Sequence, residues 1–465
     1  MKIIFDVSRL ITHIRRAAPT GIDRVDLAYA RLLNEGEGPV DFLSGGVSPS
    51  WSYAKGSAPI GRLLQRDWAT RSADGDAVYQ DLCARLVAPS WPLSEGAGVQ
   101  RLAARESPAL GPLARLARVF KSRHAGINRL PADLRGAVFL HTSHNGLENA
   151  GLIQMVKARR GAVAVMLHDL IPIDFPEFCR PREAERHEAR LLNIQRHADL
   201  VLANSTYTRD RFRAWAARGQ LPLPPIVVVP LGLDDCYLEP GACPPPLFTR
   251  PYFVTVGTIE PRKNQAFLLK VWRRLAETLG EACPRLVIVG RRGWECEAVE
   301  DLLERSSPLT DTVIEVSGLG DAALATLMLG ARGVLQPSLV EGFGLPFAEA
   351  QALGVAALAS DIAAHREIAS ADTPLLDPLD GPAWISQITA LASVGRPARN
   401  PQSGRFFSQT AHVKAARDAI DRHLTAVHWA NDHAFREVFS RQVEAHGAAS
   451  GVFLGLSLMT ETGPP

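Results

Sequence analysis

The sequence predicts an α/β protein of two domains, each built on a mostly parallel sheet with helices on both faces. The chain has 465 residues, which is more than one hydrophobic core usually serves. Short apolar runs alternate with helical patterns along most of its length, as in doubly wound sheets. A Pro-rich, aperiodic segment at residues 239–250, EPGACPPPLFTR, separates two series of such runs and indicates a linker.

The first domain is predicted at residues 1–238. It opens with a buried-strand pattern at residues 3–7, a glycine-containing loop (APTGIDR) and a helical pattern through residue 33. Residues 45–135 lack a clear period and are expected to form a basic insertion within this domain. Further strands are predicted at residues 137–140, 162–167, 200–203 and 226–229.

The second domain is predicted at residues 251–407, followed by C-terminal helices and a tail at 408–465. Because open parallel sheets bind ligands beyond the carboxyl ends of their strands, two facing sheets can hold a donor and an acceptor between them. The expected strands of this domain are residues 252–256, 286–289, 313–316, 333–336 and 356–359.

Composition excludes several classes of protein. Apolar residues make up 46% and charged residues 22%, values of a globular chain, and the net charge of +2 requires no polyanionic partner such as nucleic acid. The six cysteines are scattered without zinc-ligand spacing, which favours reduced cytosolic thiols and no metal site. The N-terminus, MKIIFDVSRL, is interrupted by Asp6 and resembles neither a signal peptide nor an anchor. We therefore expect a cytoplasmic protein.

Although the net charge of the whole chain is close to zero, one stretch of the sequence is strongly basic. Residues 101–160 contain eleven Lys and Arg against three acidic residues, a local charge of +8. A solvated surface explains most such runs. Docking on anionic lipid, where each cation contributes about 1 kcal/mol, is the other interpretation, and it predicts peripheral contact with the inner face of a membrane.

The most informative segment begins where a strand ends, near Gln336, and reads QPSLVEGFGLPFAEAQ. Pro346 suits the first turn of a helix, whose free N–H groups and dipole favour phosphate. Glu341 precedes this helix and Glu349 lies on it, and carboxylates are good acceptors for pairs of sugar hydroxyls. Each glutamate alone could equally be a solvated loop charge or a first-turn helix acid.

This segment resembles the retaining GT-B glycosyltransferases of family four, whose signature is two glutamates separated by seven residues in an EGFGLP context. Other segments are similar to that family in the same order along the chain. They are FDVSRL with PTGIDRV, HDLIPIDFPEF at 168–178, ANSTYTRDRF at 203–212, VVPLGLD at 228–234 and VGTIEPRKN at 256–264. The resemblance covers about residues 3 to 380 and implies a GT-B fold of two Rossmann-like domains facing a cleft.

The resemblance also implies roles for individual residues. Arg262 and Lys263 would neutralise the donor diphosphate in place of a metal ion, and Glu341 would hold hydroxyls of the transferred sugar. His168 would lie near the reacting carbon, where a purely structural histidine is the alternative. The remaining donor-binding candidates are Gly21, Thr258, Phe343, Gly344, Leu345 and Glu349, the last toward the ribose.

Weaker candidates on the acceptor side are Arg9, Asp23, Arg24 and Asn145, while Thr206 and Arg209 match the family pattern but could only brace the fold. The chain also departs from the family pattern. Thr258 stands where an arginine is common and Ala363 where a proline is common. Residues 407–409 replace the family's SW motif, which leaves open how the last helix docks.

The implied function is transfer of a sugar, with retention and without a metal or other cofactor, from a nucleotide-diphosphate sugar such as GDP-mannose. The TIEPRKN variant favours mannosyl- or rhamnosyl-type enzymes of surface polysaccharide synthesis, with a glycan or lipid-linked glycan as acceptor. Two alternatives remain open: a sugar epimerase on the same fold, and a non-catalytic nucleotide-sugar-binding scaffold. A phosphorylase would need a lysine for pyridoxal, and no motif suggests one.

Overall fold

The structure is a computed structural model of the chain. It describes residues 1–13, 19–44, 51–64, 73–88, 98–103, 127–128, 130–219, 222–241, 250–394 and 399–430. Most of the predicted linker and the C-terminal tail lie outside these ranges. Within them, no helix has the length and apolar character needed to cross a membrane.

The first sheet has the strand order β5-β3-β2-β1-β6-β7-β8-β9 within the described residues. Its strands pair in parallel, except that β3 runs antiparallel to both β2 and β5. All six residues of β7 are buried, as expected for a central parallel strand covered on both faces. The strands are β1 Lys2–Asp6, β2 Val40–Ser44, β3 Trp51–Ala54, β5 Ile127–Asn128, β6 Ala137–His141, β7 Ala162–Leu167, β8 Leu200–Ala203 and β9 Ile226–Val228.

Helix α2 follows the glycine loop and begins at Gly21. The Thr20 side chain accepts a hydrogen bond from the Asp23 backbone N–H, and the Asp23 carboxylate accepts one from the Thr20 backbone, which together form a capping box. The helices of this domain are α1 Ser8–His13, α2 Gly21–Glu35, α3 Ala58–Leu64, α6 Gly151–Ala158, α7 Ile171–Asp174, α8 Glu183–His197, α9 Thr206–Ala216 and α10 Asp235–Leu238.

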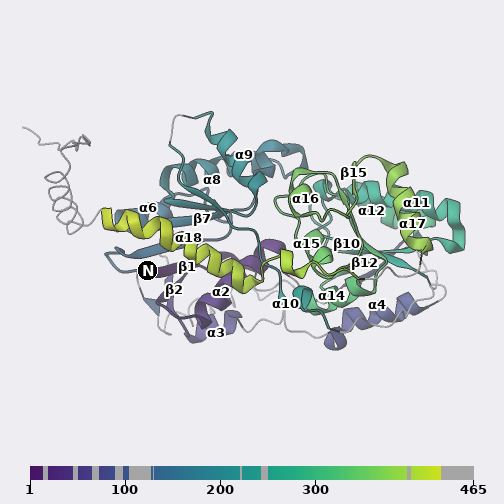
Figure 1. The fold of residues 1–465 in the computed structure, drawn as a ribbon, viewed down its shortest axis with the longest axis horizontal. Helices are drawn as coiled ribbons and strands as arrows, with labels where there is room; N and C mark the ends of the chain where they lie inside the picture. Colours follow the sequence, from purple (N-terminus) through teal and green to yellow (C-terminus); the bar gives the residue numbers. More distant parts are fainter. Residues whose placement is uncertain are drawn as a thin grey trace, which may run out of the picture.

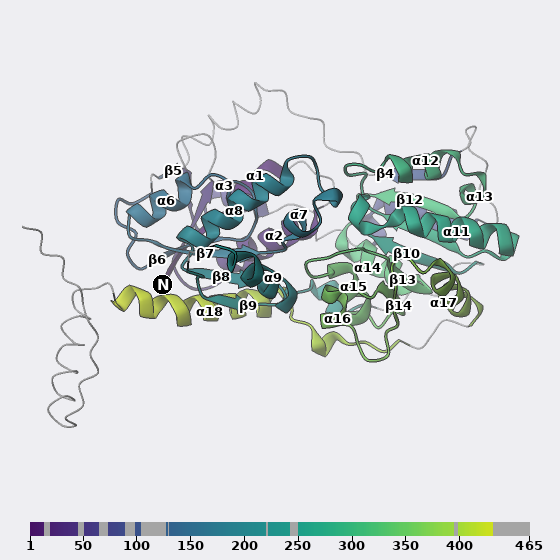
Figure 2. The same cartoon turned by 90° about the horizontal axis from the view of Figure 1, so that it is seen from above.

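The second sheet has the order β15-β14-β13-β10-β11-β12-β4, and its pairs are parallel. Figures 1 and 2 show the two sheets in separate lobes. Its strands are β10 Tyr252–Val256, β11 Arg285–Val289, β12 Val313–Ser317, β13 Gly333–Gln336, β14 Ala357–Ser360, β15 Leu375–Leu376 and β4 Gln100–Ala103. Its helices include α11 Gln265–Leu279, α12 Glu297–Arg305, α13 Ser307–Thr310, α14 Asp321–Gly330, α15 Leu345–Ala352, α16 Ala363–Ile368 and α17 Gly381–Ser393.

All the strands predicted from the sequence are present, and no predicted bound differs from the observed one by more than one residue. The expected GT-B architecture, two parallel-dominated α/β lobes, is confirmed. The insertion predicted at 45–135 needs a correction, because it does not stay within the first domain. Among the described residues of this insertion, β3, α3, β5 and residues 130–135 lie with the first sheet or its helices.

Residues 73–103 instead complete the second domain. Strand β4 extends the second sheet at the edge of β12, and helix α4, Ala77–Val87, lies among the elements of the second lobe (Figure 1). Arg285 on β11 is buried and donates to the backbone oxygens of Leu86, in the last turn of α4, and of Ala88, just past its end, at 2.5 and 2.6 Å. These bonds satisfy carbonyls that the end of a helix leaves free.

Helix α18, Gln409–Ala430, crosses back to the first lobe and packs along α2. Leu233 and Ser408 form a parallel backbone bridge directly before α18 begins. At the start of the helix, the Tyr29 hydroxyl of α2 lies 3.1 Å from His412 Nε2. A Cβ on Gly232 would lie 2.5 Å from the Ser408 carbonyl oxygen, so only glycine permits this crossing. The docking that the sequence left open is therefore made at the start of α18.

Candidate functional site

The centre of the site is an ion cluster between the loops that follow β10 and β13. Lys263 Nζ contacts one oxygen of Glu341, and Arg262 Nη1 donates to the other at 2.8 Å. Ser338 Oγ donates to the Lys263-bound oxygen at 2.8 Å. The 3-10 turn Pro261–Lys263 presents both cations from the carboxyl end of β10. Three of the predicted catalytic residues are thus brought together.

The charges in this cluster are balanced. Burial raises the pKa of Glu341, but Lys263 and Arg262 outweigh it and hold the pKa far below its usual range. Arg262 Nε also contacts Glu260, at 2.6 Å, and burial raises the pKa of that carboxyl. Two cations therefore face two carboxylates, and Arg262 bridges both. Glu260 was not predicted as a site residue, although it stands inside the motif that carries Arg262.

The loop of Glu341 touches the first domain directly. A Cβ on Gly342 would lie 2.2 Å from the His168 carbonyl oxygen, so no other residue fits there without a shift. Ser205 Oγ donates to the Gly342 carbonyl at 2.8 Å, and Thr208 Oγ1 donates to the His168 carbonyl at 3.1 Å. This contact places His168 beside the segment that carries Glu341.

His168 is buried, and its Nε2 lies 2.7 Å from the Thr142 carbonyl oxygen, so Nε2 carries the ring proton and donates. Burial lowers the pKa of His168, which favours the neutral imidazole at pH 7. Its backbone N–H donates to His144 Nε2 at 3.1 Å, and the His144 ring lies between those of His168 and His187, with centroids 5.2 and 5.1 Å away. His144 was missed, because nothing in its sequence context distinguishes it.

The predicted donor residues gather at the N-terminus of α15. Gly344 caps this helix with φ +90°, and Pro346 occupies its first turn. Gly21, at the start of α2, lies against Leu345, since a Cβ on Gly21 would be 3.4 Å from the Leu345 side chain. Phe343 is buried in the adjoining loop. Two helix N-termini, from α2 and α15, therefore meet where a diphosphate is expected.

Glu349, on the same helix, is buried and joined to the first domain by Arg24. Arg24 Nη1 donates to Glu349 Oε1 at 2.7 Å, and Nη2 contacts Asp321 at the start of α14. Burial raises the pKa of Glu349 to about 7, despite the opposing effect of Arg24. One guanidinium faces two buried carboxylates, and this excess of negative charge favours one shared proton. Asp321 was not predicted.

Thr258 directly follows Gly257, where a Cβ would lie 3.2 Å from the Lys263 side chain. Its carbonyl accepts from Gln265 Nε2 at 3.1 Å, and a Cβ on Gly293 would lie 2.8 Å from its side chain. Arg9 is held by Asp23, Thr20 and Asn145, at 2.7, 3.1 and 3.4 Å, and therefore braces the glycine loop.

The backbone N–H of Thr206 donates to Glu367 at 2.9 Å, and Arg209 pairs with its neighbour Asp210. Much of the basic stretch, residues 104–126 and 129, lies outside the described residues. Within the described part, Arg160 pairs with the acidic side chain of Asp133.

Residues 246–377 match the family model of glycosyl transferases group 1. Over 241 residues the chain is 27% identical to the serotype-specific mannosyltransferase WbdA of Escherichia coli, covering 49% of this chain and 29% of that protein. It is 30% identical over 222 residues to O-antigen chain mannosyltransferase B of Escherichia coli, covering 46% of this chain and 56% of the relative. The chain thus spans less than two thirds of either relative.

Among solved structures, Anabaena HepE in complex with UDP and glucose superposes with a TM-score of 0.56 at 16% identity, over 90% of this chain and 99% of that one. Sucrose-phosphate synthase from Thermosynechococcus elongatus gives a TM-score of 0.50 at 18% identity, over 97% and 100% of the two chains. At these identities the likeness shows the shared two-domain GT-B fold.

Proposed function

We propose that the chain is a glycosyl transferase of group 1, because residues 246–377 match the model of that family, and that it transfers a sugar from a nucleotide-diphosphate donor to a glycan or lipid-linked glycan. The proposed donor is GDP-mannose or a similar nucleotide sugar, the anomeric configuration is retained, and no metal is required. The process served is the biosynthesis of a surface polysaccharide.

The observation that carries this proposal is the contact of Lys263 and Arg262 with Glu341. A leaving nucleoside diphosphate needs positive charge, and these two adjacent cations are held at the carboxyl end of a central strand. Because Glu341 stays ionised between them, it can accept hydrogen bonds from sugar hydroxyls. The sugar would then lie beside the diphosphate, with its reacting carbon between the two domains.

In the proposed reaction, the bond between the anomeric carbon and the donor phosphate breaks as the acceptor oxygen bonds to the same face. The acceptor proton passes to the departing phosphate oxygen. His168 would position the sugar rather than act as an acid, because its Nε2 proton is already donated to a backbone carbonyl. Neutral imidazole at this place avoids adding a third cation beside Lys263 and Arg262.

The mannosyl donor is supported by the two relatives described above, both of which are named mannosyltransferases. The match to HepE, solved with UDP and glucose, makes a uridine donor the alternative for the base and sugar. A cytoplasmic site of action at the inner face of a membrane is part of the proposal, based on the basic stretch at 101–160. Sedimentation with anionic liposomes at low salt tests it, and absence of binding there would remove the membrane from the proposal.

The function is tested first by thermal shift in EDTA with GDP, UDP, ADP and dTDP, each with and without its common sugars. One diphosphate should stabilise the protein selectively. Lys263→Met should abolish that shift, whereas Lys270→Met, an exposed lysine on α11, is the matched control and should keep it. Absence of a shift with every nucleotide would refute the proposed donor site.

The reaction itself is tested by incubating the stabilising nucleotide sugar with lipid-linked and free glycan acceptors. The expected product carries the sugar in the configuration of the donor linkage, as read from anomeric proton couplings. A product of inverted configuration would refute retention while leaving the transfer intact. Conversion of the donor without any acceptor would instead identify an epimerase.

A further inference from the structure

The backbone and the ring of His168 are held by different residues. Its backbone N–H donates to His144, and its carbonyl accepts from Thr208 Oγ1. The ring is held through Nε2, which donates to the Thr142 carbonyl oxygen at 2.7 Å. Because Nε2 carries the ring proton, Nδ1 is the nitrogen that can accept a hydrogen bond from a sugar hydroxyl. The direction in which Nδ1 points therefore depends on the Thr142 carbonyl.

Thr142 stands just outside the first sheet. Strand β6 ends at His141, and the printed register of β6 with β7 also ends there, at the pair of His141 with Val165. The side chain of Thr142 is anchored instead: its Oγ1 donates to Asp26 Oδ1 on α2 at 2.7 Å. Thr142 and Asp26 are each only 1% exposed. This bond restrains the residue whose carbonyl holds the His168 ring.

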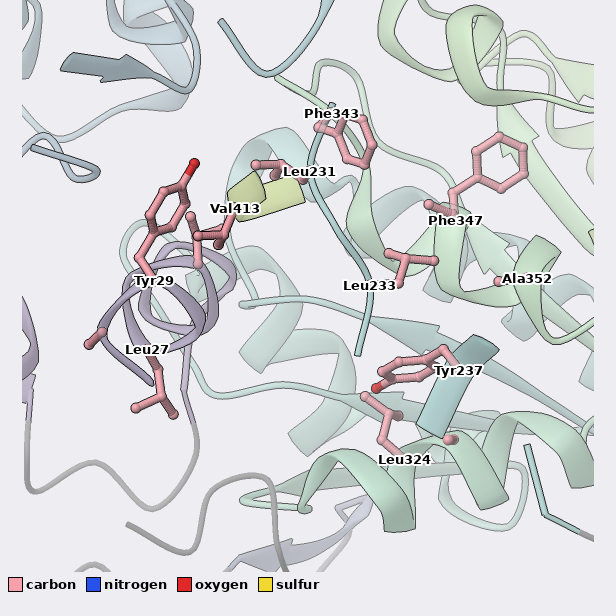
Figure 3. Close-up of a cluster of buried hydrophobic side chains, with 14 of the residues drawn as sticks. Leu27, Tyr29, Leu231, Leu233, Tyr237, Leu324, Phe343, Phe347, Ala352 and Val413 are labelled. Carbon is pink, nitrogen blue, oxygen red and sulfur yellow. The ribbon is translucent and has the colours of Figure 1, made fainter. Parts of the chain in front are cut away.

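Asp26 places a carboxyl group in a mostly apolar core. Figure 3 draws Leu27 and Tyr29 of the same helix in the buried hydrophobic cluster that also contains Val413 of α18. Burial raises the pKa of Asp26 to about 7. An apolar side chain would pack at this position without that cost, and buried groups with strongly shifted pKa values are concentrated at functional sites. The bond to Thr142 gives this carboxyl a use.

We propose that Asp26 is a positioning residue for sugar transfer: through Thr142 it sets the direction in which His168 presents Nδ1 to the donor sugar. The proposal rests on the proposed function, in which His168 positions that sugar. The two hydrogen bonds join α2 to the loop that follows β7. Since α2 also begins with Gly21, where the diphosphate is expected, one helix fixes groups on both sides of the bond that breaks.

The test measures sugar transfer and, separately, binding of the nucleoside diphosphate without its sugar, using the full chain. Thr142→Val removes the donated hydrogen bond at nearly constant volume and should lower kcat/KM for the nucleotide sugar by about tenfold. The affinity for the diphosphate, measured by titration calorimetry, should stay unchanged, because His168 faces the sugar. A general disturbance of the structure would lower both quantities.

Two variants of Asp26 and a double variant identify the interaction. Asp26→Asn keeps an acceptor oxygen in the place of Oδ1 and should retain most of the wild-type kcat/KM. Asp26→Ala removes the acceptor and should cause the same loss as Thr142→Val. The double variant of Asp26→Ala with Thr142→Val should lose no more than either single variant, because both changes break one hydrogen bond. Should a single variant fail to fold, the double variant decides, because it leaves neither partner of the bond behind.

Thr312→Val is the matched control. Thr312 is also buried, its hydroxyl donates to the Pro308 carbonyl at 3.2 Å, and it precedes β12 at the end of the second sheet away from the site. This variant should keep the full kcat/KM. If Thr142→Val transfers sugar as well as the wild type, or if it loses the diphosphate as well, the inference fails alone. If the wild type binds no nucleoside diphosphate, the proposed function fails with it.

Discussion

Replacing Glu349 by glutamine should change how the stability of the protein depends on pH. Burial of Glu349, with Asp321 competing for the same guanidinium of Arg24, raises the pKa of Glu349 from 4.5 to about 7. In the unfolded chain the pKa returns to its ordinary value. The folded protein therefore holds one more proton than the unfolded chain between about pH 4.5 and pH 7.

The sign follows from this difference in bound protons. Stability from this group is fully present below about pH 4.5 and is lost as the pH rises to about 7, at up to about 1.4 kcal/mol per pH unit. The whole window corresponds to about 3 kcal/mol. In Glu349→Gln, one carboxylate remains for Arg24 and no shared proton is needed. The free energy of unfolding of the wild type should therefore fall by about 3 kcal/mol relative to that of the variant as the pH rises from about 4.5 to about 7.

The assay is thermal unfolding of both proteins at intervals from about pH 5 to about pH 8. The difference in Tm should shift by roughly 3 °C across this range. Asp26, whose pKa burial also raises to about 7, is present in both proteins and cancels from the difference. Glu341→Gln is the control, because the pKa of Glu341 is lowered and its contribution is lost only at more acid pH. Parallel curves for wild type and Glu349→Gln would refute the reasoning.

Three further predictions concern the reaction and the fold. Lys263→Met should lower kcat/KM for the donor by about 100-fold or more, because the leaving diphosphate loses a stabilising cation. Initial rates of sugar transfer measure this, and an unchanged kcat/KM would contradict the assigned role. Arg285→Met should lower the free energy of unfolding by about 3 kcal/mol, because the carbonyls of Leu86 and Ala88 lose a charged donor. Limited proteolysis of the variant should then cut within residues 73–103, and protease resistance equal to that of the wild type would contradict this. EDTA should leave the transfer rate unchanged, and restoration of a lost rate by Mg²⁺ or Mn²⁺ would disprove metal independence.

The sequence was sufficient for the fold because central parallel strands are buried on both faces and appear as continuous apolar runs. Strand β7 is such a run. Strand β4 is the opposite case: it has four residues, QRLA, of which only Leu102 is buried, and its identity depends on a partner more than 200 residues away in β12. No local pattern could have assigned it to the second domain.

The residues of the candidate site also fall into two groups: those that a local sequence motif identifies, and those that only the folded structure brings together. Glu341, Lys263 and Arg262 were predicted because each stands in a motif with recognisable spacing. The pairing of Arg24 with Asp321 was not, since it joins residues 297 positions apart and depends on how the two domains meet. His144 was missed for a similar reason: its ring becomes significant only because folding places it between His168 and His187.

The route of the chain through β4 limits how this protein can be divided. The match of residues 246–377 to the family model suggests a module that could be cut at residues 239–250 and transplanted as a unit. A fragment that began there would lack β4 and α4, so β12 would present a bare edge to solvent and the buried guanidinium of Arg285 would lose its carbonyl partners. A chimera that exchanges the C-terminal domain in order to change donor specificity must therefore also exchange residues 73–103, because they form part of that domain.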